Sequence, residues 1–328
     1  RTSALSNGQY RQGKKMKAVT YDEYGSPQVL KLSEIDRPDP EDYEVLIQVA
    51  AAGINPIDAR LRQGEMKWLL PGRFPRVPGY DVAGIVQEAD RESDLEPGDR
   101  VLAFLDHIYG GASAEYAGCS SRCVVRIPES LSFEQAAGLP LAGSTALQSL
   151  RNYGHIKPRD RVLINGASGG VGAFAVQIAV AYGAEVTAVA SARHEEFVRS
   201  LGASHFFDYQ REDFTGSSRK WEIIFDVAGK RSYSQVKHSL ARTGQYVTTE
   251  PSFRGLAISV LTWPQSEQSH VMLAHPNKED LTELVRLWSE KQLIVTIADM
   301  IPFSDAVKAH QLIEEGGFCG KLVLKPDP

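Results

Sequence analysis

The chain has 328 residues, 42% of them hydrophobic and 23% charged, which is typical of globular proteins with a sizeable core. This length is typical of two domains. Because 36 Lys and Arg stand against 41 Asp and Glu, the formal net charge is −5. That balance argues against nucleic acid or an anionic membrane as a partner, since both favour concentrated basic surface. No apolar run reaches the roughly 18 residues that a membrane span requires.

The cysteines and the first residues bear on the cellular compartment. Cys119, Cys123 and Cys319 are an odd, sparse set that gives no disulfide framework and is typical of reducing compartments. Residues 1–15 hold no apolar stretch of signal-peptide length. We therefore predict a cytoplasmic protein. We expect residues 1–15 to be a flexible leader or a cloning remnant, with a mitochondrial presequence as the weaker alternative, and the folded part to begin near Met16.

The first third of the chain has the pattern of a β domain. Strands are predicted at Met16–Thr20, Val29–Glu34 and Glu44–Ala50, with Pro and Gly between them. The stretches "PGYDVAGIV", "EPGDRVLAF" and "SSRCVVRIP" continue the pattern. We expect a compact, mostly antiparallel β domain up to about residue 127.

Strands and helices then alternate, which predicts a parallel sheet covered on both faces. The predicted elements are strand Arg161–Asn165, helix Gly170–Tyr182, strand Glu185–Ala190, helix Glu195–Leu201, and buried strands Trp221–Asp226 and Gly244–Thr248. A helix at Asp280–Lys291 follows, and the tail predicts a strand, a helix and a strand.

The strongest motif is the turn between the first of these strands and its helix, "NGASGGVG". Gly166, Gly169, Gly170 and Gly172 let the backbone turn tightly and approach a pyrophosphate, which the N-terminus of the helix then binds. The usual first glycine of this fingerprint is Ala167, which is tolerable if its φ stays negative. A tight turn without a ligand is the alternative, but the strand–turn–helix context favours a dinucleotide site.

The end of the second strand bears on which dinucleotide binds. An acid there would hydrogen-bond the ribose of NAD, but the run is Ser191, Ala192, Arg193, His194. A hydroxyl and a guanidinium suit a 2′-phosphate. We therefore predict NADPH rather than NADH, with a merely solvated helix start as the alternative.

Seven motifs together resemble one known family. They are "AAGINPIDARLRQG", "PGYDVAGIV", "LEPGDRVLAF", "LPLAGSTALQSL", "NGASGGVG", "SLGASHFFDYQRED" and "GFCGKLVL". Their order is similar to that in zinc-free quinone oxidoreductases of the medium-chain dehydrogenase/reductase superfamily, of the zeta-crystallin-like and alkenal-reductase-like kind. The resemblance implies an α/β fold in which a Rossmann domain, a doubly wound parallel sheet, is inserted in a β-rich GroES-like catalytic domain. We expect the catalytic domain at 16–138 and 284–328 and the NADPH-binding domain at 139–283.

The same resemblance lets the zinc ligands of related alcohol dehydrogenases be checked. Their positions fall on Asn55, Tyr80 and Leu141, none of which binds zinc well. Cys119 and Cys123 have no neighbouring His or Cys pair, so we interpret them as core residues. We predict no metal site.

Residue roles also follow from the resemblance. Asn55 and Tyr80 are the candidate catalytic residues, as donors to developing oxygen charge, although Tyr80 could simply pack at the cleft wall. Where many relatives carry a tyrosine, this chain has Arg60. The candidate cofactor-binding residues are Thr145, Ala167, Ser168, Gly169, Gly170, Val171, Gly172, Ser191, Arg193, Tyr209, Val227 and Ala228.

The predicted function is zinc-independent hydride transfer from NADPH to a quinone or an α,β-unsaturated carbonyl. A 2-enoyl-thioester reductase is an alternative, because a basic entrance would suit its carrier. Candidate residues for that entrance are Arg60, Arg62, Lys67, Arg73 and Arg76. A non-catalytic NADPH-binding sensor or crystallin-like protein is another alternative, since fold alone does not decide function.

Two further expectations concern surfaces. The apolar stretch Leu256–Trp263 predicts a sheet edge that pairs across a two-fold axis in a homodimer, with a core strand as the alternative. His107 and Tyr109 lie in a loop that could line the substrate pocket, although a lone loop histidine is more often simply exposed.

Overall fold

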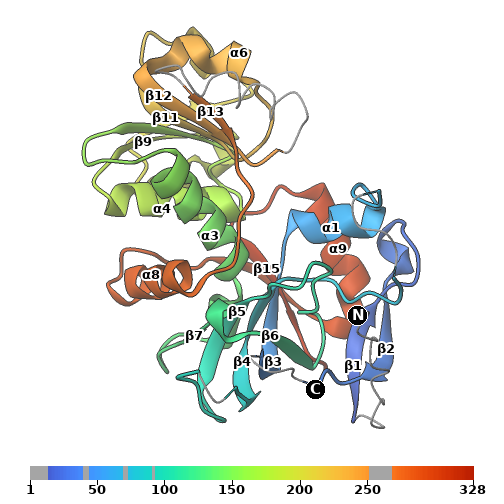
Figure 1. The fold of residues 1–328 in the computed structure, drawn as a ribbon. Coiled ribbons are helices and arrows are strands. Elements are labelled where there is room, and N and C mark those ends of the chain that lie inside the picture. The colour runs from blue at the N-terminus through green and yellow to red at the C-terminus, as the bar shows by residue number, and fades with distance from the viewer. Residues whose placement is uncertain (1–13, 40–43, 69–72, 91–92, 251–267) are drawn as a thin grey trace, which may run out of the picture.

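Two lobes, each built on its own β-sheet, make up the part of the chain that the computed structural model describes (Figure 1). That part is residues 14–39, 44–68, 73–90, 93–250 and 268–328. The stretch Leu256–Trp263, on which the homodimer prediction rests, lies outside it. None of the described helices is both long and apolar enough to cross a bilayer.

The upper lobe in Figure 1 contains a six-stranded parallel sheet of order β10-β9-β8-β11-β12-β13. This is the doubly wound order in which the chain fills one half of the sheet and then the other. The strands are β8 (Arg161–Asn165), β9 (Glu185–Ala190), β10 (His205–Asp208), β11 (Trp221–Asp226), β12 (Leu240–Thr248) and β13 (Gln268–Val271). The helices are α3 (Pro140–Gln148), α4 (Gly170–Ala181), α5 (Glu195–Ser200) and α6 (Tyr233–Val236).

The lower lobe contains a seven-stranded sheet of order β14-β15-β3-β4-β5-β7, with β6 pairing β3. Every pair is antiparallel except β14 with β15. The strands are β3 (Glu44–Ile54), β4 (Asp81–Glu88), β5 (Arg100–Phe104), β6 (Tyr116–Ser120), β7 (Val124–Arg126), β14 (Ile297–Pro302) and β15 (Lys321–Lys325). Strands from both ends of the chain therefore share one sheet, and the parallel-sheet lobe is inserted between them, which confirms the predicted fold class.

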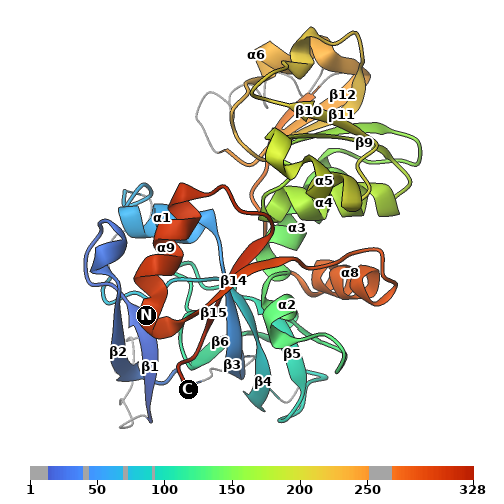
Figure 2. The same cartoon turned by 180° about the vertical axis from the view of Figure 1, so that it is seen from behind.

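Smaller elements complete the lower lobe. Helices α1 (Pro56–Gln63) and α9 (Ala306–Glu315) pack against each other (Figures 1 and 2), and α2 (Phe133–Ala137) packs on β3 and β4. A separate antiparallel pair joins β1 (Lys15–Thr20) to β2 (Lys31–Asp36). The strand that we predicted from Val29 begins later, because Pro27 opens a short 3₁₀ turn that includes Val29.

The strand and helix around the glycine motif are as predicted, with β8 at Arg161–Asn165 and α4 from Gly170. Helix α4 packs on β8, β9 and α3. Its residues Gly172–Ala179 are all buried, because a helix that is apolar all round must be covered on every side. The glycine motif is thus anchored to the core of the upper lobe.

The predicted domain boundaries stay a prediction. Helix α8 (Lys278–Ser289) runs across the boundary that we placed at 283/284, and it packs on both α3 and β7.

Candidate active site

The order in which the chain adds strands to the six-stranded sheet reverses between β8 and β11, which are parallel neighbours. From β8 the chain continues to β9 and β10 on one side, and from β11 to β12 and β13 on the other. Ligands of such sheets bind outside the carboxyl ends of the strands at this switch point. There the Asn165 amide donates to the Asp226 carboxylate at 2.7 Å, and the N–H groups of Val227 and Ala228 donate to the Asn165 carbonyl at 3.0 and 3.1 Å. The two strand ends are thereby locked together beside the glycine turn.

The glycine turn is shaped for close backbone approach. Gly166 has a φ of +90°, which glycine adopts at little cost. A Cβ on Gly172 would lie 2.1 Å from the Gly166 carbonyl oxygen, so the turn can touch α4 only because residue 172 has no side chain. Ala167 is fully buried and keeps a negative φ, which explains why alanine is tolerated in place of the usual glycine.

The start of α4 is open to a ligand. Gly169 caps the helix without a side-chain hydrogen bond, and Ser168 to Val171 are only half-buried. The free N–H groups of the first turn and the positive end of the helix dipole together suit an anion. The predicted residues 167–172 therefore form one continuous turn and helix start, called the cradle below, which has the features that suit an anion.

The end of β9 lies next to this cradle. His194 Nδ1 is 3.0 Å from Ser168 Oγ and 3.4 Å from Ser191 Oγ. Burial and the charge of Arg193 lower the pKa of His194, so it is neutral at physiological pH. Arg193 is exposed, and among the described residues its guanidinium makes no hydrogen bond or ion pair. Tyr209 is 58% exposed and donates its N–H to the Ala190 carbonyl at 3.2 Å. Ser191 and Arg193 thus lie beside the cradle, just after the end of β9.

A C-terminal segment crosses the cradle, which sequence reasoning missed. The Gly320 N–H donates to the Ser168 carbonyl at 3.3 Å, and Gly320 forms a bridge with Gly169. A Cβ on Gly170 would lie 2.8 Å from Lys321 Cδ. The motif "GFCGKLVL" is the sequence signal for this segment.

Asn55 lies between the two lobes, just before α1. Its side chain is buried and donates from Nδ2 to Asp81 Oδ2 at 2.9 Å, while its Oδ1 accepts from the Lys321 ammonium. Asp81 Oδ1 in turn accepts the N–H of Leu141 at 2.7 Å. That contact ties Asn55 to helix α3 of the upper lobe, which carries Thr145.

Thr145 and Tyr80 each donate to a backbone carbonyl. Thr145 Oγ1 is 2.7 Å from the Leu141 carbonyl, and the Tyr80 hydroxyl is 2.9 Å from that of Ile108. Burial, reinforced by the charge of Asp58, raises the pKa of Tyr80. Tyr80 therefore keeps its proton and remains able to donate a hydrogen bond.

Three charged side chains are buried in contact with Asn55. Asp58, Asp81 and Lys321 are 2%, 0% and 3% exposed. Burial, with the charge of Asp81 adding to it, raises the pKa of Asp58 to about 7. Burial also raises the pKa of Asp81 and lowers that of Lys321, while their mutual attraction opposes both shifts.

Comparison with known proteins gives the family. Residues 41–129 match the alcohol dehydrogenase GroES-like domain, and residues 201–324 match a domain family described as zinc-binding dehydrogenase. The chain is 34% identical to the chloroplastic quinone-oxidoreductase homolog of Spinacia oleracea, over 95% of this chain and 99% of that protein. It is also 34% identical to the chloroplastic NADPH-dependent alkenal/one oxidoreductase of Arabidopsis thaliana, over 96% of this chain and 81% of that protein.

The chain belongs to the quinone-oxidoreductase-like branch of the medium-chain dehydrogenase/reductase superfamily. Solved structures agree. The Coxiella burnetii quinone oxidoreductase has a TM-score of 0.88 and 35% identity, covering 96% of this chain and 100% of that one. The Escherichia coli quinone oxidoreductase complexed with NADPH has a TM-score of 0.81 and 27% identity, covering 94% and 100%. The predicted family is confirmed, and the protein is an oxidoreductase.

Arg60, which departs from the tyrosine of many quinone oxidoreductases, crosses between the lobes. Its guanidinium lies 2.8 Å from Glu65 on its own lobe and 2.7 Å from Glu250, two residues after β12. Arg62 and Arg76 are buried; Arg62 pairs with Glu314, and Arg76 stacks on Tyr24, Phe74 and Tyr109. Three of the five arginines and lysines that we predicted as a basic entrance are thus already neutralised or covered.

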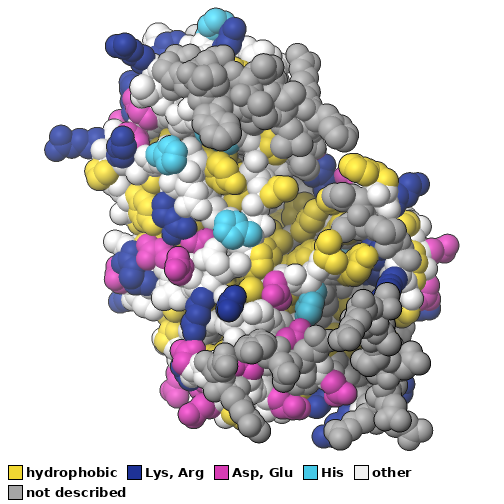
Figure 3. All heavy atoms as spheres, viewed as in Figure 1, with side chains coloured by type: hydrophobic (Ala, Val, Ile, Leu, Met, Phe, Trp, Pro, Cys, Tyr) yellow, Lys and Arg dark blue, Asp and Glu magenta, His cyan; other side chains and the backbone are white. Residues whose placement is uncertain are grey.

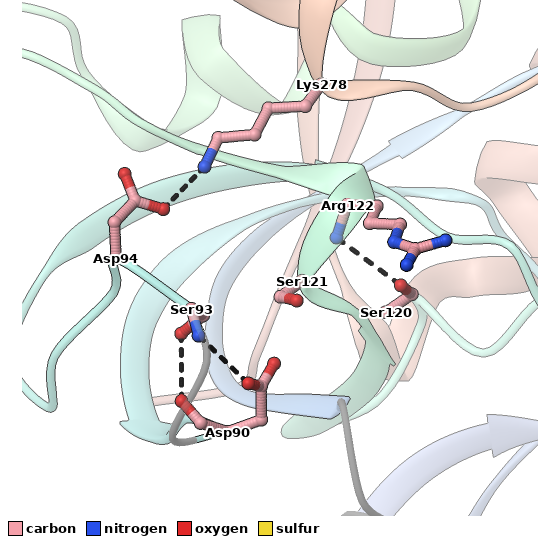
Figure 4. A pocket seen from close by; sticks show the side chains of 7 residues that line it. All are labelled: Asp90, Ser93, Asp94, Ser120, Ser121, Arg122 and Lys278. Atoms are coloured by element: carbon pink, nitrogen blue, oxygen red, sulfur yellow. Dashed lines mark hydrogen bonds and ion pairs between the residues drawn. The ribbon is translucent and has the colours of Figure 1, made fainter.

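Other predicted features lie apart from the site. His107 is 3.6 Å from Glu44, and Tyr109 lies under the Arg76 guanidinium at 4.5 Å. A surface cavity of about 560 Å³ contains none of the predicted site residues (Figure 4). Its wall includes the ion pair of Lys278 and Asp94, 2.5 Å apart, and it lies at the start of α8. It holds no glycine turn, so we do not assign the cofactor to it.

Replacing Gly172 by alanine tests the cradle. The new Cβ would have to displace the Gly166 carbonyl, so we expect NADPH affinity to fall by about ten-fold or more, measured by calorimetry. Gly216→Ala is the matched control, because no atom lies within 4 Å of its Cβ position. Equal affinities in the two variants would mean that the cradle holds no cofactor.

Replacing Asp58 by asparagine tests its titration. A carboxyl whose pKa rises from 3.8 to about 7 on folding costs stability progressively as pH rises between those values, and the cost is constant above them. The Tm advantage of Asp58→Asn over the unchanged protein should therefore grow from about pH 5 to about pH 7 and then level off. The control is Asp36→Asn, an exposed residue paired with Lys15. A difference in Tm that does not depend on pH would contradict the assignment.

Proposed function

We propose that the protein is a zinc-independent, NADPH-dependent oxidoreductase that transfers a hydride to a quinone or an α,β-unsaturated carbonyl. One observation carries the proposal: the glycine cradle lies at the switch point beside Ser191 and Arg193, where the end of β9 has no acid. The cradle suits a pyrophosphate, and the hydroxyl and guanidinium suit a further phosphate.

The residues divide into those that hold the cofactor and those that meet the substrate. Residues 167–172 would hold the pyrophosphate, Ser191, Arg193 and Tyr209 the adenosine side, and Val227, Ala228 and Thr145 the ribose and nicotinamide side. When bound, the reduced nicotinamide supplies a hydride. The protein orients the two reactants and keeps the site dry.

Negative charge that develops on the substrate oxygen needs a donor. One N–H of the Asn55 amide is occupied by Asp81, so the other is available. Tyr80 retains its proton and could turn from the Ile108 carbonyl to the substrate. Solvent then completes the protonation.

The residues at the zinc positions of related dehydrogenases do not fit zinc. Asn55 directs its oxygen to the Lys321 ammonium, and a second cation beside it would be repelled. Tyr80 holds its proton, and the Leu141 side chain has no donor atom. The chemistry of these side chains supports the proposed zinc independence.

An apolar substrate suits the surroundings of the site. Figure 3 shows hydrophobic side chains gathering where the two lobes meet. Exposed large apolar residues of the lower lobe include Trp68, Phe74 and Ile108, and Ile108 is the partner of Tyr80. The Arabidopsis relative is named for alkenal/one reduction. We propose an uncharged quinone or enone over an enoyl-thioester, because Arg60 and Arg62 are paired with glutamates and Arg76 is covered by aromatic rings.

The broader organisation stays a proposal as well. We propose domains at 16–138 with 284–328 and at 139–283, a homodimer, and a cytoplasmic location without a nucleic-acid or membrane partner. The net charge of −5 supports the absence of such partners. The compartment needs direct localisation, since both curated relatives described above are named as chloroplastic.

The cofactor preference is tested by Arg193→Gln. Losing a charged donor to a 2′-phosphate should weaken NADPH binding by about 10- to 100-fold, with little effect on NADH, in calorimetric titrations. Arg199→Gln is the control, since Arg199 pairs with Glu195 on the surface of the same region. Equal losses for both nucleotides would remove Arg193 from the 2′-phosphate site.

The reaction is tested by following NADPH oxidation with a quinone, an alkenal and an enoyl-thioester, in protein from which metals have been removed by chelation. We expect turnover with the first two acceptors and no loss on chelation. Turnover confined to the thioester would favour the enoyl-thioester alternative. Tight NADPH binding without turnover on any acceptor would favour the sensor or crystallin-like alternative.

A further inference from the structure

Three charged side chains are buried together where the lobes meet. Asp58 lies on α1, Asp81 begins β4 and Lys321 begins β15, and each is at most 3% exposed. Buried charges persist only when they are paired or neutralised. Two carboxylates against one ammonium leave one negative charge unmatched, unless one carboxylate carries a proton.

The cluster determines which way the amide of Asn55 faces. A lysine ammonium only donates and a carboxylate only accepts. Lys321 therefore selects the Asn55 oxygen, and Asp81 selects its nitrogen. If the amide turned by half a revolution, donor would face donor and acceptor would face acceptor. The remaining N–H of Asn55 is thus held in one direction.

We propose that Lys321 and Asp81 are positioning residues that hold the Asn55 amide for hydride transfer, and that the charge state of Asp58 is coupled to that arrangement. This inference rests on the proposed function only in the role given to Asn55. Lys321 reaches the reaction through Asn55, whose oxygen it contacts.

The contacts single out Asp58 as the carboxyl that is protonated. Asp81 lies 3.7 Å from the Lys321 ammonium and accepts from Asn55 and Leu141. Among the described residues Asp58 accepts a hydrogen bond at Oδ2 from the Asn55 N–H at 2.8 Å, and its Oδ1 has no hydrogen-bond partner. The less compensated carboxyl takes the proton.

The groups that face Asp58 come from several elements. Asp81 and Lys321 act on its pKa directly, and the charge of Asp58 is felt by Tyr80 and Tyr21. Arg76 acts on the pKa values of Tyr21 and Tyr80, and it opposes the rise of both. Lys321 is thus the one cation that acts directly on Asp58 in this part of the described structure, and it is shared with Asp81.

Ionisation of Asp58 has a definite consequence. Below its pKa of about 7 the charges of Lys321 and Asp81 balance. Above that value a second carboxylate competes for Lys321 and adds negative charge beneath Asn55. Both effects oppose negative charge developing on a substrate oxygen at Asn55. Turnover should therefore fall as Asp58 loses its proton.

The first test is a double-mutant cycle of Lys321→Met and Asn55→Ala, read as kcat with an accepted quinone or enone. We expect each single variant to lose about ten- to hundred-fold, and the double variant to lose no more than the worse single variant. Lys325→Met is the matched control, because Lys325 lies on the same strand, is 43% exposed and pairs with Glu134. Additive losses, or a loss confined to NADPH affinity by calorimetry, would overturn the positioning role.

The second test uses Asp58→Asn, in which the side chain keeps its shape. This test remains available if Lys321→Met does not fold. In the unchanged protein kcat should fall by about three- to ten-fold as pH rises through about 7, and the variant should lose that step while binding NADPH normally. A step that persists in Asp58→Asn refutes the coupling. If the unchanged protein binds NADPH but reduces no acceptor, the proposed function fails instead. In that case the Tm of Asp58→Asn can still be compared with that of the unchanged protein. A difference in Tm that does not depend on pH would refute the titration of Asp58.

Discussion

The contact of Lys321 with Asn55 and Asp81 is the interaction on which the arrangement of the candidate site depends. Lys321 opens the last strand, so the C-terminus of the chain supplies the cation for two elements encoded more than 200 residues earlier. The same segment lies on the glycine cradle through Gly320 and Ser168. The glycine cradle and the Asn55 amide are therefore connected by a few residues at the start of one strand.

Steric limits around the glycines explain why the cradle can form at all. Gly172 lies against the Gly166 carbonyl, and Gly170 lies against the Lys321 side chain. A side chain at either position would push the helix start away from the strand ends or from the C-terminal segment. The shape of the cradle is thus defined by close packing as well as by free N–H groups.

Arg60 forms an ion pair between the two lobes. Where many relatives carry a tyrosine, this chain has a guanidinium that pairs across the lobes with Glu250. Because both partners are partly exposed, the ion pair contributes modestly to stability. The charge of the Arg60 guanidinium is matched by Glu65 and Glu250.

The sequence by itself determined the fold class, the family, and the strand, turn and helix at the glycine motif. This pattern is local, and the spacing of its glycines can be read directly from the chain. It also placed Ser191 and Arg193 at a strand end. Only the tertiary structure decided that Asp58, Asp81 and Lys321 share one buried cluster, and that His194 joins Ser191 to Ser168. Those contacts join residues far apart in the chain, and burial, together with the charge of Asp81, raises the pKa of Asp58 to about 7. No local pattern could have revealed either, because desolvation and pairing exist only once the lobes have packed.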